Sequence, residues 1–94
     1  MPEEVTIGGL TYRVYIVDNL AEKEGCYGEI DYINQTIKID GMISDERRKQ
    51  TLLHEVMHGI LESIGELKLN QNEQKVQSIA SALYQCLKNN AISF

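Results

Sequence analysis

The sequence predicts a single α+β domain, residues 1–94, in which a small, mostly antiparallel sheet of three to four strands precedes two packed helices. Two observations lead to this prediction. Up to residue 43, β-branched and aromatic residues alternate with polar ones and are interrupted by turn residues. From Ser44 onward, apolar residues recur at steps of three and four, between residues that favour helix ends. A chain of 94 residues suits one domain.

The first two strands are predicted over residues 5–7 and 10–17, which are rich in β-branched and aromatic residues. Gly8 and Gly9 between them indicate a two-residue hairpin turn, because glycine adopts positive φ without steric cost. Alternation within the second strand predicts that one of its faces is buried. The polar segment 18–25 that follows fits either a loop or a short helical turn.

A second pair of strands is predicted over residues 26–33 and 36–40. Asn34 and Gln35 form the turn between them, and Asn34 is the residue expected to adopt positive φ. Ile30 and Tyr32 are expected to share one side of their strand, as are Ile37 and Ile39 on the partner strand.

A long helix is predicted from Ser44 to about Ile64, because Ser44 is a favourable N-cap and Gly65 a natural C-terminal stop. Three cations near its start, at positions 47–49, are expected to be solvated or to pair with carboxylates. The apolar stripe comprises Leu53, Val56 or Met57, Ile60 and Ile64. His54 and His58 lie on the flank of this stripe, where we expect them to be half-buried.

A second helix is predicted from a cap at Asn70 or Asn72 to about Asn89, after a connector over residues 66–71. Its apolar stripe comprises Val76, Ile79, Ala80, Leu83 and Leu87. The apolar tail, residues 91–94, is expected either to fold back on the body or to fray.

Composition and charge limit the classes of partner. The net charge of −5 and the pI of about 4.9 argue against nucleic acid or an anionic membrane as the main partner. The acidic N-terminus does not resemble a signal peptide and no apolar run approaches a membrane span, so we expect a cytoplasmic location. Cys26 and Cys86 are far apart in sequence and are expected to be free thiols in structural roles.

The segment H-E-V-M-H, from His54 to His58, is typical of the zinc-binding helix of a metallopeptidase and contains both histidines of the chain. Residues four apart lie on one face of a helix, so two imidazoles can bind one Zn²⁺ at roughly 2.0–2.1 Å. Glu55 lies on a neighbouring part of the helix, where it would reach a water on the metal as a general base. The alternative is a surface helix that carries these residues by chance.

The third zinc ligand is left open by the spacing, since catalytic zinc usually takes three protein ligands and the motif supplies two. Glu62 lies four residues after His58, where it would either support the His58 ring from the same helix or be an ordinary surface residue. Glu73 opens the second helix, where its charge would either partner zinc or suit the helix dipole. A symmetric helical hairpin would place Gln77 opposite His58, so a Glu73 ligand requires an asymmetric connector or crossed helices.

Three segments extend the pattern beyond the motif: I-K-I-D at 37–40, T-L-L-H-E-V-M-H-G at 51–59, and E-Q-K-V-Q-S-I-A-S-A-L at 73–83. Together they resemble the gluzincin metallopeptidases, which carry H-E-x-x-H on one helix and a glutamate on the next. The chain is most similar to the small ImmA/IrrE-type and phage-encoded members, over most of residues 27–87. The resemblance implies a zincin-like core, with His54, His58 and Glu73 as zinc ligands and Glu55 as the base.

The chain also departs from the larger relatives. It shows no DNA-binding or sensor domain, and no histidine is placed to stabilise an oxyanion. Tyr84 or another tyrosine would have to serve, although we expect Tyr84 to be a buried packing residue.

The predicted function is that of a minimal zinc-dependent peptidase acting on an unknown cytosolic protein or peptide. A zinc-activated water, with Glu55 as general base, would attack the peptide carbonyl. An extended substrate is expected to pair with a sheet edge, for which residues 37–40 are the candidate. The resemblance implies a substrate such as a repressor encoded nearby in a phage or mobile element.

Two alternatives belong to other functional classes. One is a non-catalytic protein that keeps zinc for stability or uses the zincin scaffold to bind a partner; a protein side chain at the fourth zinc position would favour it. The other is a metal-free adaptor in which His54 and His58 are packing residues. The zinc content of the purified protein separates this second alternative from the rest.

Overall fold

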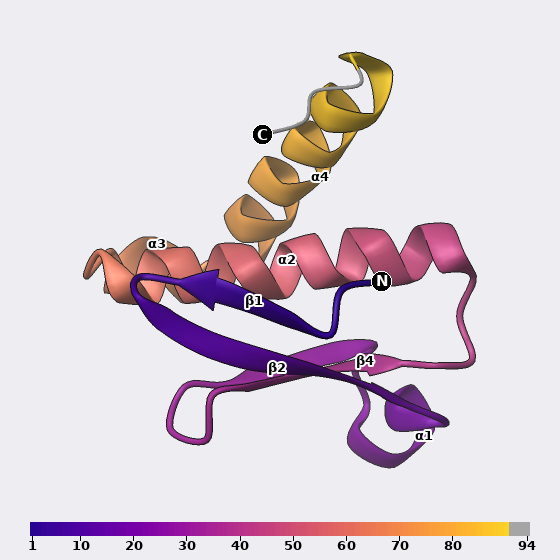
Figure 1. The fold of residues 1–94 in the computed structure, drawn as a ribbon. Helices are drawn as coiled ribbons and strands as arrows, with labels where there is room; N and C mark the ends of the chain where they lie inside the picture. The colour runs from indigo at the N-terminus through magenta and orange to yellow at the C-terminus, as the bar shows by residue number, and fades with distance from the viewer. Residues whose placement is uncertain (91–94) are drawn as a thin grey trace.

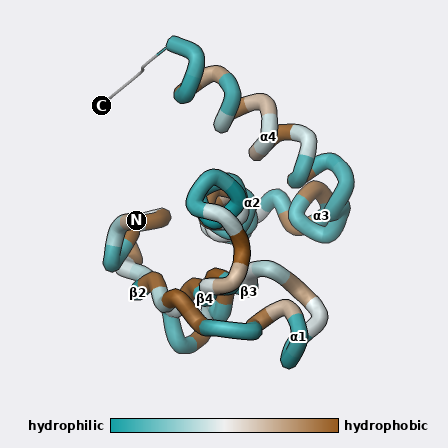
Figure 2. The backbone as a smooth tube through the Cα atoms, turned by 90° about the vertical axis from the view of Figure 1, so that its right-hand side faces the viewer, coloured by the Kyte–Doolittle hydropathy of each residue, from teal (hydrophilic) through white to brown (hydrophobic). Residues whose placement is uncertain are grey.

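In a computed structural model, which describes residues 1–90, the chain forms three layers: a four-stranded sheet, the helix α2 and the helix α4 (Figure 1). Figure 2 looks nearly along α2 and shows that this helix lies between the sheet and α4. The predicted α+β class, with a small sheet followed by packed helices, is therefore confirmed.

The sheet is mixed and has the strand order β1-β2-β4-β3. Its strands are β1 (Glu4–Ile7), β2 (Leu10–Val17), β3 (Gly28–Asp31) and β4 (Thr36–Asp40). The pairs β1–β2 and β3–β4 are antiparallel, whereas β2 and β4 run parallel. The two predicted hairpins are thus present, and a parallel pair joins them.

The expectation that residues 37–40 form a sheet edge is wrong, because β4 lies between β2 and β3. The second hairpin is formed by β3 and β4, and its second strand, β4, is the one that pairs with β2. Ile37 and Ile39 consequently have no exposed surface. The free edge nearest α2 is that of β3, which contacts this helix.

The turns agree with the prediction in position, and one differs in detail. Gly8 and Gly9 both have positive φ, as expected. In the second turn, Gln35 rather than Asn34 adopts positive φ. The Asp31 carboxylate accepts hydrogen bonds from the backbone and side-chain amides of Asn34, at 2.9 and 2.8 Å, and so leaves the left-handed position to the next residue.

Residues 18–25, for which the sequence fitted either a loop or a short helical turn, contain the short helix α1 (Leu20–Glu24). Leu20 is buried beneath the sheet end, and the buried Asp40 accepts hydrogen bonds from the backbone amides of Ala21, at 3.2 Å, and Met42, at 2.9 Å. These bonds satisfy the Asp40 carboxylate and anchor the segment that leads into α2.

Helix α2 (Asp45–Ser63) is capped as predicted. The Ser44 hydroxyl accepts from the backbone amide of Arg47, and Gly65 has φ of 78°. Its predicted stripe is partly wrong, because Ile60 and Ile64 are exposed. The helix buries two stripes instead of one, since it lies between two layers: Leu52 and Val56 pack on the sheet, while Met57 and Leu61 face α4.

The connector contains the short helix α3 (Leu67–Asn70), which the sequence did not indicate. Helix α4 (Glu73–Asn90) begins after Asn72, whose side chain accepts from the backbone amide of Lys75 at 3.0 Å. Val76 and Ala80 are buried as predicted, whereas Ile79 is exposed because α4 contacts only one neighbouring layer. The predicted tail, residues 91–94, lies outside the described residues.

Two further predictions concern the surface of the molecule. No helix within residues 1–90 is long and apolar enough to cross a membrane. Cys26 and Cys86 are free thiols as predicted, but Cys86 is exposed, so only the half-buried Cys26 suits a structural role.

Candidate metal centre

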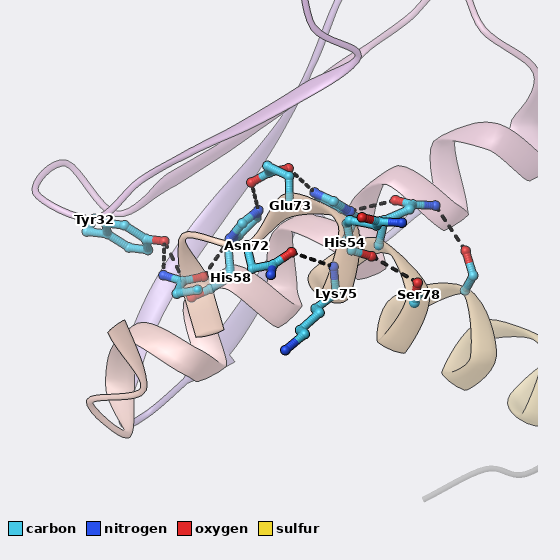
Figure 3. A network of polar contacts seen from close by, with 11 residues as sticks. Tyr32, His54, His58, Asn72, Glu73, Lys75 and Ser78 are labelled. Atoms are coloured by element: carbon cyan, nitrogen blue, oxygen red, sulfur yellow. Dashed lines mark hydrogen bonds and ion pairs between the residues drawn. The ribbon is translucent and has the colours of Figure 1, made fainter. Parts of the chain in front are cut away.

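The two histidines of α2 lie one turn apart, and both direct Nε2 at the first residue of α4 (Figure 3). His54 Nε2 lies 3.2 Å from Glu73 Oε2, and His58 Nε2 lies 2.7 Å from Glu73 Oε1. One potential ligand atom from each residue falls within 4.8 Å of the others. The structure thus brings together the three residues expected from the sequence and the resemblance.

Glu73 reaches the histidines because the connector is asymmetric and the helices cross. Helix α3 packs beside the end of α2, and α4 then leaves at a steep angle, so only the facing parts of α2 and α4 are close (Figure 1). Glu73 therefore lies opposite both rings, and Gln77 lies one turn further along, beside His54. This arrangement meets the geometric condition that a Glu73 ligand requires.

Two amide side chains hold the other ring nitrogens. His54 Nδ1–H donates to Gln77 Oε1 at 2.7 Å, and His58 Nδ1–H donates to Asn70 Oδ1. Asn70 in turn donates to the Tyr32 hydroxyl at 3.1 Å. Acceptors at Nδ1 place the proton there and leave the lone pair of each imidazole at Nε2.

The donor set suits a cation. With the ring protons on Nδ1, the two Nε2 lone pairs and the Glu73 carboxylate converge on one point, and a cation bound there would be stabilised by all three groups. Two imidazole nitrogens and one carboxylate oxygen are also the donor set of many catalytic zinc sites. The residues therefore fit a zinc ion.

The other proposed carboxylate lies elsewhere. Glu62 is exposed, as its surface interpretation predicts, and it does not belong to the cluster of three. Support of His58 comes from Asn70 instead. Neither Asn70 nor Gln77 was assigned this role from the sequence, although Gln77 lies four residues after Glu73 and hence on the same helix face.

Glu55 lies beside the cluster but is not part of it. It is only 7% exposed, and burial raises the pKa of its carboxyl, an effect that the neighbouring His54 and His58 oppose. Its carboxylate faces Gly28 at the start of β3, where a β-carbon, if residue 28 had one, would lie 2.5 Å from the Thr51 methyl carbon and 3.3 Å from Glu55 Oε2. A glycine at this position therefore keeps the strand close to the carboxylate without blocking it.

Two hollows flank Glu55 along the free edge of β3. The first, of about 400 Å³, extends from the site toward Tyr27 and the start of α2. The second, of about 360 Å³, extends toward Tyr32 and Asn70. Gly28, Glu55 and Glu73 line both, so the cluster lies where the two hollows meet.

Tyr84 does not reach this region. It is half-buried and lines a separate apolar groove between α2 and α4, so the expected burial is met only in part. Tyr32 instead contacts the surroundings of the cluster, because its hydroxyl accepts from Asn70.

Comparison with models of protein families, with curated proteins and with solved structures finds no match to this chain.

Proposed function

We propose that this protein is a zinc-dependent peptide-bond hydrolase of gluzincin type, with His54, His58 and Glu73 as the zinc ligands. The convergence of both Nε2 atoms on Glu73, with each Nδ1 held by an amide oxygen, carries the proposal. This chemistry needs a metal with nitrogen and oxygen ligands and an adjacent base, and Glu55 supplies the base.

A zinc ion bound here would act as a Lewis acid that lowers the pKa of water toward about 7 and polarises a carbonyl group. Glu55 accepts the proton of the attacking water and returns it to the leaving amine. Gln77 and Asn70 keep both rings in the orientation that presents Nε2.

The substrate would bind as an extended peptide along β3. This strand is the edge of the sheet next to α2, and the two hollows lie along it on either side of Glu55. The free backbone groups of an edge strand can pair with an added strand, as in β-augmentation. Gly28–Asp31, rather than residues 37–40, would therefore be the strand that pairs with the substrate.

The open surroundings of Glu73 favour an enzyme over a purely structural zinc site. Its side chain is 70% exposed, and hollows reach the cluster from both sides. Structural zinc sites are closed by a fourth protein ligand, whereas catalytic sites keep one position accessible.

The test is the substitution Glu55→Gln, which keeps the size of the side chain and removes its basicity. We expect zinc to remain bound and peptide cleavage to fall by at least about 100-fold, the contribution typical of a general base. Cleavage is measured by mass spectrometry on a peptide library, and zinc content by elemental analysis.

The matched control is Glu62→Gln, the same change on the exposed face of α2, which should leave both measurements unchanged. Cleavage by the Glu55→Gln protein at the wild-type rate would remove Glu55 as the base.

A further inference from the structure

The first hollow beside the site contains one cationic side chain among its lining residues, that of Arg47. The charged groups otherwise lining it are Glu55 and Glu73, which belong to the proposed site. The rest of the lining is neutral or apolar, including Cys26, Ile43 and Thr51. A guanidinium in a hollow that leads away from a peptidase centre suggests that it selects part of the substrate.

Arg47 is held toward the hollow rather than toward its neighbours on α2. Its guanidinium lies 5.8 Å from the centre of the Tyr27 ring, which also lines the hollow. Thr51, one turn further along the same face, donates its hydroxyl to the Arg47 carbonyl at 2.7 Å. Arg47, Thr51 and Glu55 therefore follow one another at steps of four along the face that meets β3.

The other cations near the start of α2 already have carboxylate partners. Arg48 and Lys49 both pair with Asp45, and Lys88 pairs with Glu46. Within residues 1–90, Arg47 takes part in no ion pair. Its five N–H donors thus remain available for a planar, two-oxygen acceptor, which is the shape of a carboxylate.

The spacing places this donor about three substrate residues from the reacting bond. Arg47 precedes His54 by seven positions, which corresponds to about 10 Å along a helix. An extended peptide advances about 3.3 Å per residue, so about three residues cover that distance. A peptide paired with β3 would extend past Gly28 and Tyr27 directly into this hollow.

We propose that Arg47 forms a carboxylate-binding subsite that selects substrates with an acidic group about three residues from the cleaved bond. This inference rests on the proposed function, because it assumes that a peptide follows β3 through the site. The acidic group is either an aspartate or glutamate side chain or the carboxylate at a peptide's C-terminus. The subsite would give a strongly acidic protein local affinity for acidic chains.

The experiment measures binding, so that it does not depend on turnover. The probes are alanine-rich octapeptides with blocked ends, in which one glutamate or one glutamine is moved through each position. A second series has a free C-terminal carboxylate and no acidic side chain. Affinities for the zinc-loaded Glu55→Gln protein are obtained from fluorescence anisotropy of labelled peptides.

We expect glutamate at one position to strengthen binding by about two- to fivefold over glutamine, as for an exposed ion pair. Adding Arg47→Gln should abolish this preference. Adding Lys49→Gln instead, which removes the same charge two positions away and outside the hollow, should preserve it. A preference for the internal glutamate or for the free terminus identifies which source of carboxylate the subsite takes.

Equal affinity for the glutamate and glutamine peptides, a preference that survives Arg47→Gln, or no measurable binding would overturn the subsite. Cleavage of the same peptides by the wild-type protein tests the proposed function separately. A preference dependent on Arg47 without any cleavage would contradict the hydrolase and leave Arg47 as a carboxylate-binding residue, whereas cleavage without that preference would support the hydrolase and overturn the subsite.

Discussion

The two sides of α2 are held to the molecule in different ways. On the sheet side, four buried residues, Ile7, Tyr12, Ile37 and Ile39, form a core surrounded by six partly buried apolar side chains. On the α4 side, the buried core comprises Met57, Leu61, Val76 and Ala80, with Leu69 and Leu83 packed against it. The polar contacts of the candidate metal centre supply much of what else joins these two helices.

The candidate metal centre lies between α2 and α4, so a bound ion would also help to hold these two helices together. His54 and His58 belong to α2 and Glu73 to α4, so one ion would join these two layers. The sheet layer contributes no ligand to the cluster. Metal binding should therefore stabilise the attachment of α4 much more than it stabilises the sheet.

The largest effect is expected from Ile37→Ala on the sheet side. Ile37 has no exposed surface, so its truncation should lower the free energy of unfolding by about 2–5 kcal/mol, with or without zinc. Denaturant unfolding measures this change. Ile33→Ala is the control, because Ile33 is 91% exposed, and it should change the stability by less than about 0.5 kcal/mol. Equal effects of the two variants would contradict the position of the core.

Metal removal is expected to destabilise the packing of α4 on α2 rather than the sheet. Free zinc at 100 times its dissociation constant should stabilise the fold by about 2.7 kcal/mol. After chelation, amide hydrogen exchange should accelerate in α4 while β2 and β4 keep their protection, because their core lies away from the centre. Uniform acceleration through the sheet and α4, or none at all, would remove the proposed distinction between the two layers.

A smaller effect is expected from Gln77→Ala, which removes the acceptor for His54 Nδ1–H without removing a ligand. Loss of such a partner typically weakens metal binding by about 10- to 100-fold. Zinc affinity is measured by competition with a chromophoric chelator. Gln74→Ala, an exposed glutamine on the same helix, serves as the control. Unchanged affinity in the Gln77 variant would show that this amide does not orient the ring.

Much of the fold could be predicted from local patterns. Alternation identifies the strands, Gly8 and Gly9 identify the first turn, and Ser44 and Gly65 mark the ends of α2, because each signal depends on neighbouring residues. The interior position of β4 could not be predicted in this way. It depends on a parallel pairing with β2, for which neither strand carries a local signal.

The site divides in the same manner. His54, Glu55 and His58 follow from spacing within one helix, whereas Glu73 needed the resemblance to a family. Asn70 and Gln77 went unassigned, because they meet the histidines across 12 and 23 positions in sequence. Those contacts depend on α3 and on the crossing of α2 and α4, which no periodicity encodes.

The most direct test of the centre is the zinc content and affinity of the full chain purified without a histidine tag. We expect one zinc ion per chain. We also expect His58→Ala and Glu73→Ala each to weaken its binding by more than the Gln77 variant does, since both remove a ligand. A folded wild-type chain that binds no zinc, or one whose zinc affinity survives both substitutions, would contradict the assignment of His54, His58 and Glu73 as a zinc site.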